Sequence, residues 1–145
     1  MATDFHTCEN YAASRDTKMA SFLIDTDVLI DISRGNTNAA DFVDALSGDI
    51  FIGRISAMEL IIGARNKKDQ KVIEKFVSLY SIKELSDAIG LESHQRLKQY
   101  SKSRGLTLAD ALIAATAIVN DLVLVSRNAK HFQPIKELRF SKAAY

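Results

Sequence analysis

A run of apolar residues that ends in carboxylates constrains this chain more than any other feature. The run is FLIDTDVLID, residues 22–31, and it predicts a short buried strand followed by Asp25, Asp27 and Asp31. In open α/β sheets, ligands bind in the crevice at the carboxyl ends of the strands. Neighbouring carboxylates repel each other, and a hard divalent cation is the simplest counter-charge for them. The run therefore predicts a ligand or metal site at a strand end.

Length and composition limit the classes of protein that the chain can belong to. Its 145 residues are enough for one domain, and 47% hydrophobic with 26% charged residues is ordinary for a globular protein. The net charge of +1 excludes a strongly basic surface, so any nucleic-acid binding must come from a local patch. Cys8 is the only cysteine, which excludes an intramolecular disulfide and a cysteine-rich zinc site.

The first residues of the sequence differ from the rest. Residues 1–18 are polar and show no periodicity, so we expect a flexible leader or an added extension there, and a single domain over residues 19–145. The leader has no apolar core of a signal peptide, and no stretch approaches the ~18 apolar residues of a membrane span. We therefore expect a cytoplasmic protein that does not enter membranes.

From residue 21 onward, strand and helix patterns alternate. This order predicts an α/β fold, a three-layer α/β/α sandwich around a central, mostly parallel sheet. The continuously apolar strand at 122–125 fits a sheet that is covered on both faces. The expected strands are 21–24, 50–52, 81–84, 122–125 and 138–140.

Three acids fall at strand-to-helix junctions of this pattern: Asp25, Glu59 and Asp110. Helices that follow parallel strands begin at one edge of the sheet, so acids in their first turns can converge. Helix capping is the alternative explanation, because Ser56-x-x-Glu59 and Thr107-x-x-Asp110 both fit the capping-box pattern and Asp25 suits an N-cap. Three such acids together favour a metal site over three independent caps.

A further apolar strand ends in polar residues at Ser126-Arg127-Asn128. Ser126 and Asn128 either support the same site or simply turn the chain. Arg127 lies beside the predicted site and is a candidate contact to the phosphates of a nucleic acid. Further candidates cluster at the end of the helix before Gly105, and for each of them a solvated charged face is the favoured alternative: Lys98, Lys102 and Arg104.

At this point the chain resembles a known family. The segments FLIDTDVLI, SAMELIIGA, LTLADALIAATA and LVLVSRNAKHF occur in the order typical of PIN-domain nucleases, and are most similar to the VapC-type toxin ribonucleases. The resemblance covers roughly residues 21–140. It implies a PIN-like fold, an acidic cluster that binds Mg²⁺ or Mn²⁺, cleavage of RNA, a homodimer, and neutralisation by a small antitoxin as the toxin of a type II toxin–antitoxin pair.

The resemblance also assigns residues, with some departures. Asp25, Glu59 and Asp110 match the three core acids of the family, and Asn128 matches the position of a frequent fourth acid. Asp27 stands where the family often has Asn, Ser126 replaces a common Thr, and His131 stands where another acid is often found. We expect Asp25 and Asp110 to be direct metal ligands, Glu59 to bind through water or to orient the attacking water, and Asp27 to support the site.

Two other readings of the same residues remain open. Asp25-Thr-Asp27-Val-Leu resembles the first motif of haloacid-dehalogenase phosphatases, in which Asp25 would be the nucleophile, although no later pair of aspartates follows a strand. In the second reading the acids only cap helices and the domain is a non-catalytic binding module. Independently of these readings, five apolar residues near the basic stretch 65–75 could form a groove for a partner helix, for which core packing is the alternative: Ile61, Ile62, Phe76, Leu79 and Tyr80.

Overall fold

The central element of the protein is a five-stranded, entirely parallel sheet. The computed structural model describes residues 20–145, so the expected leader lies outside the described residues. The strand order is β3-β2-β1-β4-β5, which places β1 at the centre. The strands are β1 Ala20–Ile24, β2 Gly48–Gly53, β3 Ser81–Lys83, β4 Val123–Ser126 and β5 Phe140–Lys142. The register pairs Leu23 of β1 with Phe51 on one side and with Leu124 on the other.

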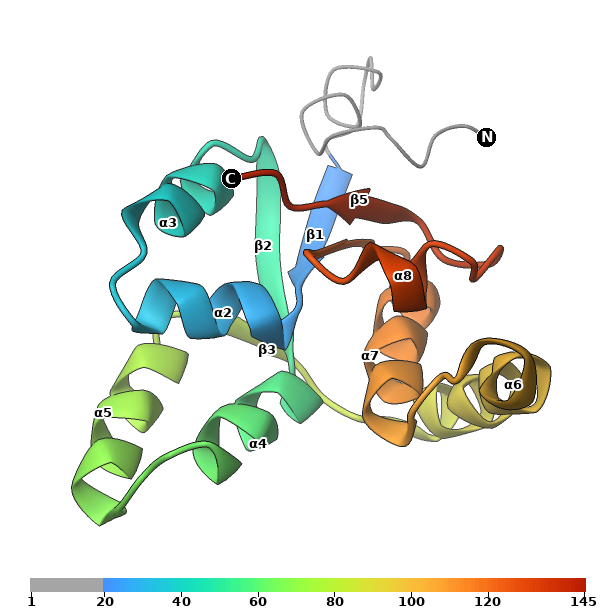
Figure 1. Ribbon diagram of the computed structural model, residues 1–145, viewed down its shortest axis with the longest axis horizontal. Coiled ribbons are helices and arrows are strands. Elements are labelled where there is room, and N and C mark those ends of the chain that lie inside the picture. The colour runs from blue at the N-terminus through green and yellow to red at the C-terminus, as the bar shows by residue number, and fades with distance from the viewer. Residues whose placement is uncertain (1–19) are drawn as a thin grey trace.

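Helices cover both faces of this sheet, as Figure 1 shows. They are α2 Thr26–Ser33, α3 Thr37–Asp44, α4 Arg54–Ile62, α5 Lys67–Val77, α6 Asp87–Arg104, α7 Leu108–Val119 and α8 Ala129–Phe132. One core cluster joins Phe22 and Ile24 to residues of α2, α3, α4 and α5. A second cluster joins Leu23, on the opposite face, to residues of α6, α7 and α8. This alternation along β1 produces two buried faces and confirms the predicted three-layer α/β/α sandwich.

The predicted elements agree with the observed ones, with small differences in their bounds. All five expected strands are present, although β4 and β5 lie one or two residues further along the chain than expected. The helix expected to begin at Ser56 begins at Arg54, with Gly53 as its N-cap. The one-turn helix α8 was not expected. Among the described residues, no helix is long and apolar enough to span a membrane.

Candidate functional site

The candidate site lies at the carboxyl edge of the sheet. Here β1 runs into α2, β2 into α4, and β4 into the turn before α8. Figure 1 shows α2, α4 and α7 gathered around the same end of β1. Side chains from stretches that are far apart in the sequence can therefore meet there, which is the arrangement expected of an open α/β sheet.

Asp25 occupies the centre of this edge, directly after β1. It is the N-cap of α2 and 5% exposed, and its Oδ1 accepts a hydrogen bond from the Thr26 N–H at 2.8 Å. The backbone N–H of Asp25 donates to the carbonyl of Val125 on β4. Because β4 pairs with β1, the Ser126 hydroxyl also reaches Asp25 and donates to Oδ2 at 2.7 Å. Asp25 is thus a cap, but a buried one that a second strand holds in place.

Asp27 lies next to Asp25 and shares its partner. Its Oδ2 accepts a hydrogen bond from the backbone N–H of Arg127 at 3.2 Å and lies 3.4 Å from the Ser126 hydroxyl. Its other oxygen, Oδ1, is buried and has no hydrogen-bond partner within residues 20–145. Burying a carboxylate oxygen without a hydrogen-bond donor costs free energy of folding. Oδ1 is therefore an acceptor that a cation or a water molecule would satisfy.

The electrostatics of the two aspartates follow from this crowding. Burial, followed by the charge of Asp27, raises the pKa of Asp25 to about 7, and the charge of Asp110 adds to the effect. Burial also raises the pKa of Asp27. Hydrogen bonds from Ser126 and from backbone N–H groups oppose both shifts but do not cancel them. Both carboxyls therefore tend to hold protons when no cation is bound, and a cation bound there would favour their ionised forms.

Glu59 reaches the site through Thr26. The Thr26 hydroxyl lies 2.7 Å from Oε1 of Glu59 and 2.8 Å from Oγ of Ser56. An ionised carboxylate only accepts, and a hydroxyl has one proton, so Thr26 donates to Glu59 and Ser56 donates to Thr26. The backbone of Thr26 is at the same time bonded to Asp25. Thr26 therefore links Glu59 of α4 to Asp25.

Asp110 enters the edge from the first turn of α7. Its backbone N–H donates to the Thr107 hydroxyl at 3.2 Å, which caps the helix. Its Oδ2 lies 3.6 Å from Nδ1 of His131 on α8, and that nitrogen is buried without a hydrogen-bond partner in the described chain. The side chain of Asp110 faces the site closely enough for its charge to raise the pKa of Asp25.

The capping alternative has different outcomes for the two patterns. Thr107 caps α7, as the Thr107-x-x-Asp110 pattern predicts. The prediction for Ser56-x-x-Glu59 is wrong, because α4 begins at Arg54 and the Ser56 hydroxyl is buried against Thr26. Glu59 is therefore inside the helix and has no capping role.

A preformed metal cage is not present as the side chains stand. Within residues 20–145, no group of three or more Asp, Glu, His or Cys side chains is arranged so that it could hold a metal ion. The charges of Asp27 and of Asp110 instead act on Asp25, and Glu59 is linked to the site through the Thr26 hydroxyl. The donor set is nevertheless all-oxygen and negatively charged, and it includes the partnerless Oδ1 of Asp27, which suits Mg²⁺ or Mn²⁺.

The candidate RNA contacts fall in two places. Arg127 lies at the carboxyl edge, beside Ser126, with its side chain 53% exposed. Lys98, Lys102 and Arg104 are exposed on the last turns of α6. Asn128 precedes α8, and its backbone N–H donates to the Ser126 hydroxyl, which helps to fix the orientation of that hydroxyl.

Sequence reasoning missed two participants. Thr26 was read only as the middle of Asp-x-Asp. Tyr145, which donates a hydrogen bond to Oδ2 of Asp31, received no role. Both act through partners that are distant in sequence, so nothing local marks Tyr145, and the position of Thr26 between two acids is the one local signal.

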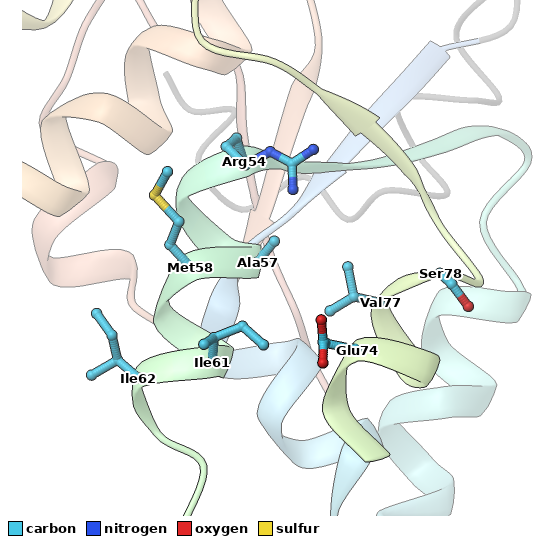
Figure 2. A pocket seen from close by; sticks show the side chains of 8 residues that line it. All are labelled: Arg54, Ala57, Met58, Ile61, Ile62, Glu74, Val77 and Ser78. Atoms are coloured by element: carbon cyan, nitrogen blue, oxygen red, sulfur yellow. The ribbon is translucent and has the colours of Figure 1, made fainter. Parts of the chain in front are cut away.

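An apolar pocket of 590 Å³ lies between α4 and α5. Figure 2 shows Ile61 of α4 pointing toward Val77 of α5, whereas Met58 and Ile62, which also line the pocket, extend from the other side of α4. Two of the residues expected there, Ile61 and Ile62, line this pocket, whereas Phe76 and Tyr80 pack against the core. Ile62 is 82% exposed, so α4 presents an uncovered apolar surface within the described protein.

Comparison with known proteins identifies the family. The chain matches the PIN domain family over residues 22–138. It belongs to that family. The PIN domain is similar to ribonuclease VapC10 of Mycobacterium tuberculosis, with 31% identity over 120 residues that cover 81% of this chain and 90% of VapC10. It is also 32% identical over 120 residues to ribonuclease VapC1 of Methanocaldococcus jannaschii, covering 81% of this chain and 83% of that protein.

Solved structures agree with this assignment. A toxin–antitoxin complex from Klebsiella pneumoniae is 30% identical, with a TM-score of 0.68 over 80% of this chain and 93% of that one. DNA-bound VapBC from Salmonella typhimurium has a TM-score of 0.76 over 87% of this chain and 100% of that one, and at 23% identity this likeness concerns the fold alone. The PIN domain therefore falls among the VapC ribonucleases, as its motifs predict.

Proposed function

We propose that this PIN domain is a Mg²⁺- or Mn²⁺-dependent endoribonuclease and the toxin of a type II toxin–antitoxin pair. The observation that carries the proposal is the pair of buried Asp25 and half-buried Asp27, which lies at the carboxyl edge of the sheet with the pKa of both groups raised. In a relative of the VapC ribonucleases, such a pair is best explained as a cation site that faces a phosphodiester.

Each acid has a distinct part in this proposal. Asp25 and Asp110 would hold the ion directly, and Asp27, fixed by Ser126 and Arg127, would hold it through Oδ1 or support Asp25. A divalent ion, when bound, supplies a water of lowered pKa and stabilises charge on the phosphate. Glu59, held by the Thr26 hydroxyl, would orient the attacking water or accept its proton.

The two rival readings account for fewer of these contacts. A phosphatase that used Asp25 as its nucleophile would leave Glu59 and Asp110 without a role. A binding module whose acids only cap helices does not explain Glu59, which caps nothing, or the cost of burying Asp25 beside Asp27. Both readings predict that RNA stays uncut with Mg²⁺ or Mn²⁺ as well as with EDTA.

Cleavage of an RNA pool by the purified protein tests the proposal. We expect cutting with Mg²⁺ or Mn²⁺, none with EDTA, and a loss of about 100-fold or more for Asp25→Asn, Glu59→Gln and Asp110→Asn. Asp41→Asn removes an exposed carboxylate of α3 and serves as the matched control, with activity retained. Metal-independent cutting, or full activity of Asp25→Asn, would refute the assignment.

Two protein partners belong to the same proposal: a small antitoxin and a second copy of the chain. The similarity to a toxin–antitoxin complex supports the first, and the uncovered apolar surface of α4 supports a protein partner of either kind. Light scattering would report a homodimer, and titration with the cognate antitoxin should stop RNA cleavage at a fixed stoichiometry. A monomer at all concentrations would remove the homodimer from the proposal.

A further inference from the structure

Arg127 is held by two residues that the catalytic proposal does not use. Its NH1 donates to Oδ2 of Asp31 at 3.0 Å, and its guanidinium lies 5.2 Å from the centre of the Tyr145 ring. The Tyr145 hydroxyl donates to the same Oδ2 of Asp31. Asp31 and Tyr145 thus contact the guanidinium from different elements, one from α2 and the other from the segment after β5. We call this pair the Asp31–Tyr145 clamp.

Several contacts fix the clamp in place. The Ala143 N–H donates to the carbonyl of Ser126 at 2.9 Å, which ties the segment that carries Tyr145 to the end of β4. The rings of Tyr145 and Phe42 lie 6.0 Å apart, so α3 supports the tyrosine from behind, and Figure 1 shows the C-terminal end of the described chain beside α3. Burial and the bond to Asp31 raise the pKa of Tyr145, which keeps its hydroxyl a donor.

The clamp determines where the positive charge of Arg127 lies. Asp31 follows Asp27 by four residues in α2, so the two side chains share a helix face, with Cβ atoms about 6 Å apart. The backbone N–H of Arg127 contacts Asp27 and its guanidinium contacts Asp31. The charge is therefore directed along α2, next to the acidic edge but one helical turn away from Asp27.

The guanidinium remains available for a ligand. An arginine side chain has five N–H donors, its fork matches phosphate oxygens, and the Arg127 side chain is 53% exposed. A phosphate that neighbours the one at the acidic edge would find its counter-charge here. A loose arginine would instead lose side-chain entropy on binding RNA, which the clamp avoids by holding it in advance.

We propose that Arg127 is a binding site for an RNA backbone phosphate next to the scissile one, and that the Asp31–Tyr145 clamp positions it. This inference rests on the proposed ribonuclease function. Arg127 would contact the substrate directly, whereas Tyr145 is a positioning residue that acts only through Arg127. Removing Tyr145 should therefore matter only while Arg127 is present.

A double-mutant cycle tests this dependence. Binding of a short fluorescein-labelled single-stranded RNA is measured by anisotropy, with EDTA and in an Asp25→Asn background so that the RNA stays intact. We expect Arg127→Ala to weaken binding about tenfold. It should also reduce the slope of log affinity against log salt by about 0.7, the value for one phosphate contact in a single strand.

The tyrosine variants then separate positioning from general stability. Tyr145→Ala should reproduce a large part of the loss of RNA affinity seen in Arg127→Ala. Tyr145→Phe, which keeps the ring and loses the hydroxyl, should lose less affinity. In the Arg127→Ala background, Tyr145→Ala should cause no further loss. Additive losses, an unchanged salt slope in Tyr145→Ala, or equal affinity of Arg127→Ala and the parent would each overturn the proposal.

A matched arginine controls for the loss of charge. Arg139 is also paired with an aspartate, Asp121, at 2.8 Å, but it lies near the amino end of β4, at the opposite edge of the sheet. Arg139→Ala should leave affinity and salt slope within error of the parent. Cleavage by the unsubstituted protein is assayed separately. Failure to cut RNA would contradict the proposed function, whereas cutting together with additive losses of affinity in the double-mutant cycle would contradict only the role of the clamp.

Discussion

The hydroxyl of Thr26 lies 2.7 Å from Oε1 of Glu59, a contact between residues 33 positions apart. The backbone of the same threonine donates to Asp25. Thr26 is thus the covalent neighbour of one proposed metal ligand and the hydrogen-bond donor to the residue proposed to orient water. A single side chain fixes how far Glu59 stands from Asp25, which makes it a target for substitution.

Thr26→Val should remove this link while keeping the shape of the side chain. We expect kcat for RNA cleavage to fall about 10- to 100-fold because Glu59 loses its position. The free energy of unfolding should fall by about 1–2 kcal/mol because Ser56 and Glu59 lose a buried partner. Steady-state kinetics and urea denaturation measure the two effects.

Thr37→Val supplies the matched control for that change, since Thr37 is an exposed residue at the start of α3, whose N-cap is Asn36. It should leave both kcat and the unfolding free energy near those of the parent. Equal kinetics for Thr26→Val and Thr37→Val would show that Glu59 needs no support from Thr26.

Asp25→Asn should have opposite effects on the protein without and with metal. Without metal, removing one charge from the crowded Asp25–Asp27 pair should raise the melting temperature by a few degrees. With millimolar Mn²⁺, the parent should gain stability in proportion to binding, and the variant should gain little. Thermal denaturation with EDTA and with Mn²⁺ measures both. A variant that is destabilised in EDTA and still responds to Mn²⁺ would contradict the metal assignment.

The main features of the fold could be predicted because they depend on local patterns. The apolar runs at 22–24 and 122–125 predict buried parallel strands, and Thr107 and Gly105 mark helix ends that the structure confirms. The start of α4 could not be found in the same way. Gly53 caps that helix without a side-chain hydrogen bond, so the sequence carries no capping signal at the true start. The Ser56-x-x-Glu59 pattern therefore predicted a start two residues too late.

The site was predictable only as a set of acids at one sheet edge. That Asp25 and Asp110 interact follows from the order of strands and helices, which the alternating pattern predicts in outline. The contacts that position the acids could not be predicted, because they join side chains across the fold. The bonds from Thr26 to Glu59 and from Tyr145 to Asp31 depend on how α4 and the last segment pack, which no short-range pattern encodes.

Gly48 tests how closely β1 and β2 approach. It pairs with Ala20, has φ of +154°, and a Cβ there would lie 1.8 Å from the Ala20 carbonyl oxygen. Gly48→Ala should therefore destabilise the protein by about 2–4 kcal/mol, because backbone at the central strands must move. Gly90→Ala is the control: it lies inside α6 with open space around it and should stabilise by about 1 kcal/mol. Urea denaturation compares them, and a neutral Gly48→Ala would show that the sheet adapts there.

Stability of the metal-free protein should fall as the pH rises from about 4 to about 7. Burial raises the pKa of Asp25 from 3.8 to about 7, so within this window the folded state holds a proton that the unfolded chain has released. The free energy of unfolding then decreases with pH by at most about 4 kcal/mol and levels off above the folded pKa. Burial also raises the pKa of Asp27, so Asp27 acts in the same direction. The hydrogen bond from Tyr145 lowers the pKa of Asp31, so Asp31 affects stability only below about pH 4. Urea denaturation in EDTA at pH 5 and pH 8 measures the difference, and Asp25→Asn should remove most of it. Higher stability at pH 8 than at pH 5 in the parent would mean that Asp25 is already ionised at pH 5 in the folded protein without a cation.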